Sequence, residues 1–411
     1  MDLKFRRLRA HGRLVAIPVV AAVAVAGAAT TASASTHHVS AHATISKSVL
    51  AEVKAYVQKA EEAPAWVAPG PAVNAKKALK GKTIVTFPIS TEIDACNLKG
   101  QQGYIDAEAK ALGAKVVALS PVPGPPGWIS SLTTAVTDHA SAVVALCGPS
   151  PALMGDTAGG ALATLKADHI PVIDGNYNQI GGNAAFPTTD LSAESGVNTE
   201  QGVETDLADA LLNLNGKPAE IEFLDSPQVA QDSGALYALK AGIAKWCPNT
   251  CQIVKTELYG TADWSTPTET SQVSSDLQAN PSINTVIVTF DGMADGIEST
   301  VATDASTHPG LKMYAWGGGL AEIKDVQSGG TYAGDSGPDE KWDAFDQLDQ
   351  VIRLLAGKPA APVAKEVAPN IFFTKSNAAS FSVNGAGSVY SDKAYSNGAF
   401  VTDFEKLWGV S

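Results

Sequence analysis

Short apolar runs alternate with segments of helical spacing along most of the chain. Residues 84–87 and 142–146 are such runs, and each is followed by a stretch whose apolar residues recur every three or four positions. The runs return at roughly 30-residue intervals, the length of a β-α-β unit. Strands that are apolar throughout indicate a parallel sheet covered by helices on both faces. The expected strands are 84–87, 116–119, 142–146, 170–173, 221–224, 253–254, 285–288 and 313–315.

The same alternation restarts after a helix predicted over residues 195–214. The chain therefore contains two successive α/β units of similar plan, each near the usual size of a domain. The predicted fold is α/β, with two Rossmann-like lobes that are each a parallel sheet with helices on both faces. The other expected helices are 49–60, 104–112, 129–136, 151–167, 235–246, 342–355 and 404–408, and residues 376–397 are expected to form a surface loop.

The first 34 residues have the pattern of a signal peptide. Five basic side chains precede an apolar stretch over residues 14–29, and Ala32-Ser33-Ala34 is a small-x-small cleavage signal. We expect cleavage before Ser35 and hence secretion or a periplasmic or cell-surface location. An uncleaved anchor is the alternative, although the stretch is short of the ~20 apolar residues that a spanning helix needs. Residues 35–81 then form an N-terminal helix and an extended strap, with Trp66 as its anchor.

Composition and charge narrow the class of protein. Apolar residues make up 45% and charged residues 17%, so the chain can bury a large core. The formal charge is −13, and without residues 1–34 it is −17, from 24 basic and 41 acidic side chains. That acidity argues against a nucleic-acid partner. Arg353 is the one arginine outside the signal peptide.

Enzyme motifs are missing from the sequence. It contains no G-x-S-x-G elbow, no H-E-x-x-H, no P-loop and no G-x-G-x-x-G. Residues 317–319 are three glycines after a predicted strand, which suit a tight strand-to-helix turn better than a phosphate loop. We therefore favour a binding protein and predict no catalytic residue, no metal site and no cofactor.

Four local motifs resemble one family. They are the "IPV" strand in residues 169–173, the "DW" turn at Ala262-Asp263-Trp264, the "ND-x-MA" turn at residues 290–294 with Phe290 in place of Asn, and the "GFDG" turn at residues 314–318 with Gly317 in place of Asp. Residues 82–374 thereby resemble the type I periplasmic binding proteins, the ribose-binding-like solute receptors of ABC importers.

The resemblance implies a three-segment hinge between the lobes, with crossings near residues 188–190, 336–338 and 370–374. Lobe one would comprise residues 82–188 and 337–370, lobe two residues 189–336 and 371–376, and residues 377–411 a C-terminal extension. It also implies a monomer that closes around a small-molecule ligand at the carboxyl ends of the strands and docks on an ABC transporter permease.

The candidate ligand-binding residues follow strand ends. Carboxylates and amides suit vicinal hydroxyl groups, and aromatic rings suit a sugar face or a cation. Core packing is the alternative for each aromatic residue, and helix N-capping is the favoured interpretation of Asp291. The candidates are Glu92, Asn97, Asp174, Asn176 and Tyr177 in lobe one, and Asp232, Phe290, Asp291, Trp316 and Asp335 in lobe two.

The position of Arg353 constrains the ligand. It lies within a predicted helix away from these strand ends, so no guanidinium is expected in the site to receive a carboxylate or phosphate. Lys99 and helix N-termini leave other routes for an anion. The interpretation we favour is a receptor for a carbohydrate. The alternatives are a receptor for a cationic amine and, from another class, a secreted α/β hydrolase.

The four cysteines are predicted to form two disulfides after export. Cys247 and Cys251 flank a turn, which makes a local bridge easy. Cys96 follows the first strand and Cys147 ends the third, and these strands are neighbours in a doubly wound sheet. Buried free thiols are the alternative.

Overall fold

The computed structural model describes residues 44–410 apart from 63, 92, 94, 150–152, 156–159, 176–190, 227–228, 230–231, 233, 262, 265, 380–394 and 396–397. The predicted signal peptide, the candidate site residues Glu92, Asn176 and Tyr177, and the crossing near 188–190 lie outside the described residues. So does most of the predicted loop at 376–397. None of the described helices combines the length and the apolar character that a bilayer crossing requires.

Lobe one is built on a five-stranded parallel sheet of order β2-β1-β3-β4-β5. Its central strand β3 is buried at every position, as the uninterrupted apolar run predicts. Helices α3 (Gln101–Ala111), α4 (Pro125–Thr137) and α5 (Ala161–Ala167) connect the strands. The strands are β1 (Thr83–Pro88), β2 (Lys115–Ala118), β3 (Ala142–Leu146), β4 (Val172–Asp174) and β5 (Ala193–Glu194).

Lobe two is built on a six-stranded sheet of order β13-β11-β10-β9-β7-β8. All neighbours are parallel except β13, which runs antiparallel to β11. The strands are β7 (Glu220–Asp225), β8 (Gln252–Leu258), β9 (Thr285–Val288), β10 (Lys312–Trp316), β11 (Tyr332–Pro338) and β13 (Asn370–Thr374). The helices are α6 (Thr199–Asn213), α7 (Ala235–Trp246), α8 (Pro267–Ala279), α9 (Asp291–Asp304) and α10 (Leu320–Ser328).

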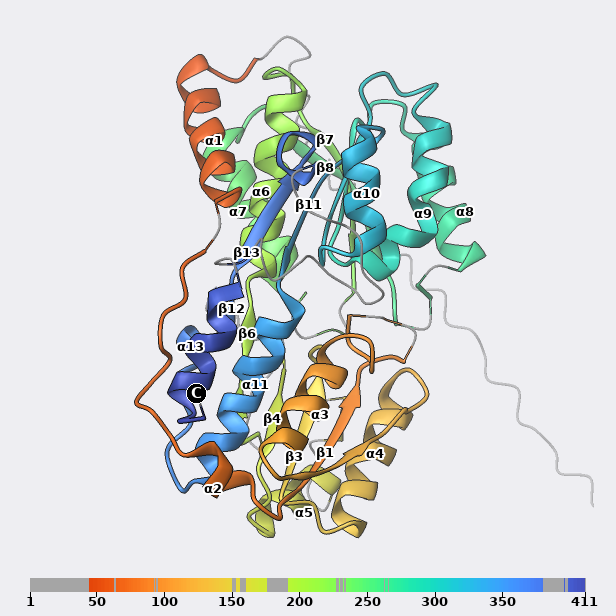
Figure 1. Ribbon diagram of the computed structural model, residues 1–411. Coiled ribbons are helices and arrows are strands. Elements are labelled where there is room, and N and C mark those ends of the chain that lie inside the picture. The colour runs from red at the N-terminus through yellow and green to blue at the C-terminus, as the bar shows by residue number, and fades with distance from the viewer. Residues whose placement is uncertain are drawn as a thin grey trace, which may run out of the picture. The chain divides into compact units, whose positions relative to one another are not determined.

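The chain passes between the two lobes at the ends of these elements. Strand β11 of lobe two runs into α11 (Glu340–Leu355), which packs against α3 and β4 of lobe one (Figure 1). The chain returns through η2 (Val363–Lys365) and β12 (Val367–Ala368), which pairs with β6 (Gly196–Val197), and then enters β13. The predicted lobe boundaries stay a prediction.

Helix α1 (Lys47–Ala60) packs against α6 of lobe two, and the strap that follows it reaches lobe one (Figure 1). Trp66 in the strap lies edge-on to Phe404 of α13 (Ala399–Leu407), with the ring centroids 5.4 Å apart. The short helix α2 (Ala75–Leu79) then leads into β1. Trp66 thus anchors the strap to the C-terminal helix.

Several predicted elements differ in extent from the structure, and three of these differences have a local cause. The helix expected from residue 195 begins at Thr199, because Asn198 caps it and residues 196–197 pair with β12 as β6. The described part of the helix expected over 151–167 is α5, which begins at Ala161 after Gly160. The first three residues of the loop expected over 376–397 instead belong to the short helix α12 (Lys375–Ala378), which has a capping box at Thr374.

Both predicted disulfides are confirmed. Cys96 and Cys147 are bonded with their Cα atoms 5.8 Å apart, and this bond joins the segment after β1 to the end of β3. Cys247 and Cys251 are bonded with their Cα atoms 5.4 Å apart, across the turn between α7 and β8.

Candidate ligand-binding site

The carboxyl ends of the two sheets meet. Pro149, just after β3 of lobe one, forms an antiparallel bridge with Val229, just after β7 of lobe two. Trp264, after β8, is half-buried and packs against the apolar clusters of both lobes. Residues that follow the strands of one lobe therefore lie next to residues that follow the strands of the other. This is where a ligand sits in α/β folds whose strands end at a common edge.

Asp174 is the acidic candidate of lobe one that lies within the described residues. It ends β4 and is fully buried, and neither of its carboxylate oxygens has a hydrogen-bond partner in the described structure. Burial, and secondarily the charge of Glu194, raise its pKa well above the usual range for an aspartate. A ligand hydroxyl or ammonium group is the kind of partner that such a carboxyl group lacks.

Asn97 has a different role from Asp174 in the lobe-one loop. Its side-chain amide donates to the carbonyl of Thr91 at 2.8 Å, and its Oδ1 accepts from the backbone N–H of Lys99 at 2.8 Å. The neighbouring Cys96–Cys147 bond ties the same loop to β3. Both features fix the loop after β1, so Asn97 shapes its own turn, and a ligand contact by this residue stays a prediction.

In lobe two, Asp291 and Asp335 hold the turn between β10 and α10. The backbone N–H of Gly319 donates to Asp291 Oδ2 at 2.5 Å, and that of Gly318 donates to Asp335 Oδ1 at 3.3 Å. Gly317 has a φ of +144°, and a Cβ there would lie 2.6 Å from Asp291 Oδ2. The three glycines are thus required by a tight turn, as predicted, and two of their N–H groups are already engaged by carboxylates.

The interpretation of Asp291 as the N-cap of its own helix was wrong. The N-cap of α9 is Phe290, and Asp291 is the first residue of the helix. Its carboxylate accepts instead from Gly319, which is the N-cap residue of the neighbouring helix α10. The reason is that the short connections after β9 and β10 bring both helix starts to one edge. The second oxygen of each aspartate, Asp291 Oδ1 and Asp335 Oδ2, has no partner among the described residues.

Asp291, Glu322 and Asp335 are buried close together, which raises the pKa values of their carboxyl groups. Burial raises the pKa of Asp291 to about 8 and that of Glu322, in the first turn of α10, to about 11. Burial and then the charges of Asp291 and Glu322 raise the pKa of Asp335 well above its usual range. Like charges at this spacing cannot all ionise, so part of the cluster is protonated at neutral pH. The cluster can therefore donate hydrogen bonds as well as accept them.

Asp232 lies between β7 and α7 and is fully buried. Neither of its oxygens is satisfied by a hydrogen bond within the described residues, and burial raises its pKa well above the usual range, with a further contribution from Asp225. Asp225 ends β7, and burial raises its pKa to about 7. These two residues add a second acidic position to the lobe-two side of the site.

The predicted aromatic residues pack together. The ring of Phe290 lies 5.2 Å from that of Trp264 and 6.3 Å from that of Trp316, measured between centroids. Trp316 is 1% exposed, and its indole N–H donates to Asn370 Oδ1 at 3.4 Å. In the present arrangement Trp316 is a core residue, while Phe290 retains a small exposed edge. Ligand contact by either ring stays a prediction.

Sequence reasoning missed one residue beside the site and one buried polar contact. The indole Nε1 of Trp264 has no hydrogen-bond partner in the described structure, and its position after β8 within the Asp263-Trp264 pair was the available signal. Gln101, the first residue of α3, donates from Nε2 to Glu340 Oε2 at 2.7 Å and to Asp343 Oδ2 at 2.8 Å. Gln101 thereby joins the start of α3 to the start of α11. No motif in the sequence predicts that contact.

Arg353 is held inside the protein. It is 3% exposed, its Nε donates to Asp349 Oδ2, and its NH1 donates to the carbonyl of Pro71 in the strap at 3.1 Å. The guanidinium is thereby committed to the strap and α11. Within the described ranges, no group of three or more His, Cys, Asp or Glu side chains is arranged to hold a metal ion.

Comparisons with known proteins identify the fold. No protein-family model matches the chain, and no curated protein matches it in sequence. Among solved structures, an ABC sugar transporter subunit from Rhodobacter sphaeroides is 17% identical, with a TM-score of 0.61 over 73% of this chain and 100% of that one.

Two further solved structures give the same result. An ABC transporter solute-binding protein from Agrobacterium vitis with bound allitol is 17% identical, with a TM-score of 0.61 over 74% of this chain and 98% of that one. Another from Mycobacterium smegmatis with bound glycerol is 15% identical, with a TM-score of 0.59 over 75% and 99%. The fold expected from the sequence motifs is confirmed: the chain has the two-lobed α/β fold of the ABC-transporter solute-binding proteins.

Proposed function

We propose that the protein is an exported solute-binding protein that captures a small neutral polyol or sugar and presents it to the permease of an ABC importer. The two-lobed fold and the bound allitol and glycerol of two structural neighbours support this proposal. So does the predicted signal peptide. In this role the protein binds and releases its ligand unchanged, acts as a monomer and needs no cofactor.

The observation that carries the proposal is the set of buried carboxyl groups at the facing strand ends. Asp174 in lobe one, and Asp232, Asp291 and Asp335 in lobe two, each keep at least one oxygen without a partner in the described structure. Carboxyl groups of this kind accept from, and when protonated donate to, the hydroxyl groups of a polyol. The Trp264–Phe290 pair supplies an apolar surface beside them.

An anionic ligand fits this site poorly. The amides of Gly318 and Gly319, which would otherwise receive a phosphate, donate to Asp335 and Asp291. The one arginine outside the signal peptide is committed to Asp349 and Pro71. A phosphate or carboxylate would therefore meet carboxyl groups in place of free backbone N–H groups or a guanidinium.

A cationic amine is the second candidate ligand. The acidic cluster of Asp291, Glu322 and Asp335 lies beside Phe290, and carboxylates with aromatic faces are the usual surroundings of an organic ammonium group. The same protein fold would serve in either case, because closure between lobes does not depend on the ligand's charge.

A binding panel on the secreted protein tests the proposal and separates the two ligands. Thermal shift followed by calorimetry would compare pentoses, hexoses, inositols and alditols with choline and putrescine, and with citrate and a sugar phosphate. A polyol that binds and is released unchanged supports the proposal. Binding of an amine alone selects the second candidate, and turnover of a glycoside or ester contradicts both. N-terminal sequencing that begins at Ser35 checks export, and small-angle scattering checks closure with the ligand bound.

A further inference from the structure

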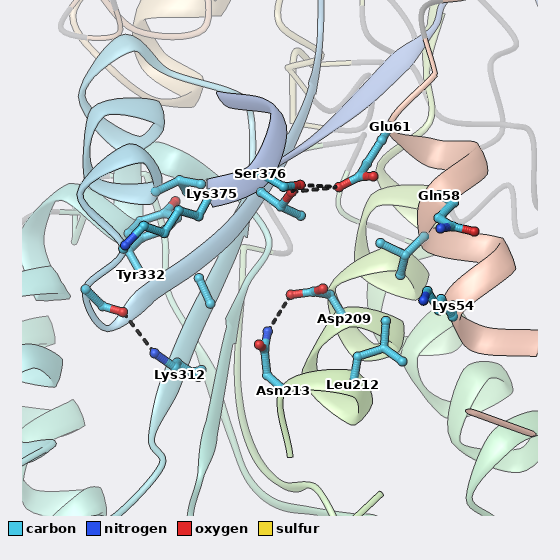
Figure 2. A pocket seen from close by; sticks show the side chains of 16 residues that line it. Lys54, Gln58, Glu61, Asp209, Leu212, Asn213, Lys312, Tyr332, Lys375 and Ser376 are labelled. Carbon is cyan, nitrogen blue, oxygen red and sulfur yellow. Dashed lines mark hydrogen bonds between the residues drawn. The ribbon is translucent and has the colours of Figure 1, made fainter. Parts of the chain in front are cut away.

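A pocket lies at the opposite edge of the lobe-two sheet from the candidate ligand-binding site. It encloses about 370 Å³ and is bounded by α1, α6, the end of α10, the starts of β10 and β11 and the end of β13 (Figure 2). Because β10 and β11 are parallel, their first residues lie at the edge opposite to Asp291 and Asp335. We call it the amino-edge pocket, and it shares no residue with the candidate ligand-binding site.

Three lysines from three different elements line this pocket. They are Lys54 of α1, Lys312 at the start of β10 and Lys375 at the start of α12. No ion pair joins any of the three to a carboxylate in the part of the chain that is described. The chain as a whole carries an excess of acids, so a pocket with three lysines and two acids departs from the rest of it.

Two of the lysines lie at the C-terminal end of α10. Lys312 Nζ donates to the carbonyl of Gly330 at 3.0 Å. Lys375 Nζ lies against Gly329, where a Cβ would come within 2.3 Å of it. Helix C-termini attract cations, and an ammonium group has three N–H donors. Lys312 therefore keeps donors available beyond its one bond to Gly330.

The floor and the α1 side of the pocket carry acidic and amide side chains instead of lysines. Asn213 donates from Nδ2 to Asp209 Oδ2 at 2.6 Å and to the hydroxyl oxygen of Tyr314 at 2.9 Å. Glu61, at the α1 side, accepts from the hydroxyls of Thr374 at 2.6 Å and Ser376 at 3.3 Å (Figure 2). Apolar side chains fill the remaining wall: Val57, Leu212 and Val326.

We propose that the amino-edge pocket binds a small hydroxycarboxylate, with its carboxylate groups on the lysines and its hydroxyl group on Asp209 and Asn213. The three ammonium groups require negative charge, the floor requires a hydrogen-bond donor, and the apolar wall accommodates a short carbon skeleton. Inorganic phosphate has the negative charge and, in its P–OH group, a hydrogen-bond donor, but it has no carbon skeleton to contact the apolar wall. Helix α1 supplies Lys54 and Glu61, so the pocket exists because the N-terminal helix packs on lobe two.

Asp209 makes the binding depend on pH. Burial, opposed by Tyr314 and Asn213, raises its pKa to about 6. The charged and titratable groups that face it are Glu61 of α1, Lys312 and Tyr314 of β10, and Asp206 of its own helix. Protonation of Asp209 removes a negative charge from the floor, so the anion binds more tightly at pH 5.5 than at pH 7.5.

Calorimetry on the full secreted chain tests the proposal, with L-malate as the probe and succinate and inorganic phosphate as comparisons. Malate should bind more tightly than succinate, which lacks the hydroxyl, and phosphate should bind most weakly. Lys312→Gln and Lys375→Gln should each weaken malate binding by about three- to tenfold, since each removes one charge-assisted contact at a partly exposed position. Lys324→Gln, on the exposed face of α10 and outside the pocket, should leave it unchanged.

The outcomes are separable from those of the sugar-binding test. Equal melting temperatures of the three variants show that the pocket substitutions leave the fold intact, and an unchanged polyol affinity shows that the carboxyl-edge site is independent. Absence of malate binding at millimolar concentration overturns the proposal. Malate binding that survives the Lys312→Gln, Lys375→Gln double variant, or that weakens equally in Lys324→Gln, overturns it as well.

Discussion

The two edges of the lobe-two sheet carry opposite chemistry. At the carboxyl edge, Asp291, Glu322 and Asp335 are buried around a glycine turn. At the amino edge, Lys312 and Lys375 gather at the end of α10 around a pocket. Parallel β-α-β connections cause this difference, because they place every helix N-terminus at the carboxyl edge and every C-terminus at the amino edge. Helix N-termini stabilise anionic side chains and C-termini stabilise cationic ones.

The direction of the helix dipoles determines which chemical groups each edge of the sheet can bind. In the turn before α10, at the carboxyl edge, two N–H groups that could receive an anion are already used by the protein's own carboxylates. The outward face of that edge is therefore acidic and suits hydroxyl groups or cations. At the amino edge, the carbonyl of Gly330 accepts from Lys312, and this lysine lines the pocket with donors left over that suit an anion.

The largest expected effect comes from the disulfides, which lie one at each kind of edge. Cys96–Cys147 closes a loop of 51 residues at the carboxyl edge of lobe one, and Cys247–Cys251 closes one of four residues at the amino edge of lobe two. Replacing the first pair with serine should lower the free energy of unfolding by about 4 kcal/mol, and replacing the second by about 2 kcal/mol, because longer loops gain more entropy when released. Chemical denaturation measures both.

Measurements of ligand affinity should also distinguish the two disulfides. Loss of Cys96–Cys147 frees the loop that carries Asn97, so it should also weaken polyol binding, whereas loss of Cys247–Cys251 should not. Equal effects of the two double variants on affinity would contradict the placement of the ligand at the carboxyl edge.

The second prediction concerns the pH dependence of stability. The folded-state pKa of Asp225 is about 7, above its ordinary value of 3.8, because of burial. The folded state thus favours the protonated form, and the resulting stability is fully present below about pH 4 and is lost as the pH rises through about 7. The loss should be on the order of 4 kcal/mol for this residue. Denaturation curves from pH 4 to 8 should show the decline, and Asp225→Asn should make it shallower while the other buried acids keep their contribution.

Asp138→Asn is the matched control for that experiment. Asp138 is exposed at the end of α4, and its substitution should leave the slope of stability against pH as it is. A slope that stays the same in Asp225→Asn would show that Asp225 ionises normally in the folded protein.

The third prediction addresses the ligand directly. Asp335→Ala should weaken polyol binding by about 1–3 kcal/mol, the cost of leaving a buried hydrogen-bonding group without its partner, while a melting curve stays cooperative. Asp335→Asn should weaken it less, because an amide retains one acceptor and a donor, as a protonated carboxyl group does. Calorimetry on both variants distinguishes the two cases. An unchanged affinity in Asp335→Ala would remove this residue from the site.

Much of the fold could be predicted because the strands are buried on both faces. Residues 142–146 and 285–288 contain no polar interruption that would shift a boundary, apart from Thr285, and β3 and β9 have these limits in the structure. The neighbouring positions of β1 and β3 followed from the doubly wound plan and gave the Cys96–Cys147 bond. Periodicity was sufficient wherever burial, rather than a specific polar contact, sets the structure.

The polar contacts were harder to predict. Asp291 was expected to cap its own helix, and only the three-dimensional approach of Gly319 shows which helix start it satisfies. The amino-edge pocket joins Lys54, Lys312 and Lys375, which are far apart in the sequence and belong to no motif. These lysines come together because α1 packs against α6. The pattern of apolar positions does not predict which residues of the two helices face each other.

The smallest effect, and the one that isolates the amino edge, is expected from Tyr56→Phe in α1. The Tyr56 hydroxyl donates to Glu204 Oε2 of α6 at 2.8 Å, and the ring lies 5.2 Å from that of Trp246, measured between centroids. The substitution removes the hydrogen bond and keeps the ring contact, so the packing of α1 on lobe two should weaken by about 1 kcal/mol. Hydrogen exchange of the α1 amides should then be about fivefold faster.

Malate affinity should fall in the same variant, because α1 supplies one wall of the amino-edge pocket. Polyol affinity should stay the same, because no residue of α1 is among the candidate site residues. A parallel loss of both affinities would show that the two edges are coupled through the sheet.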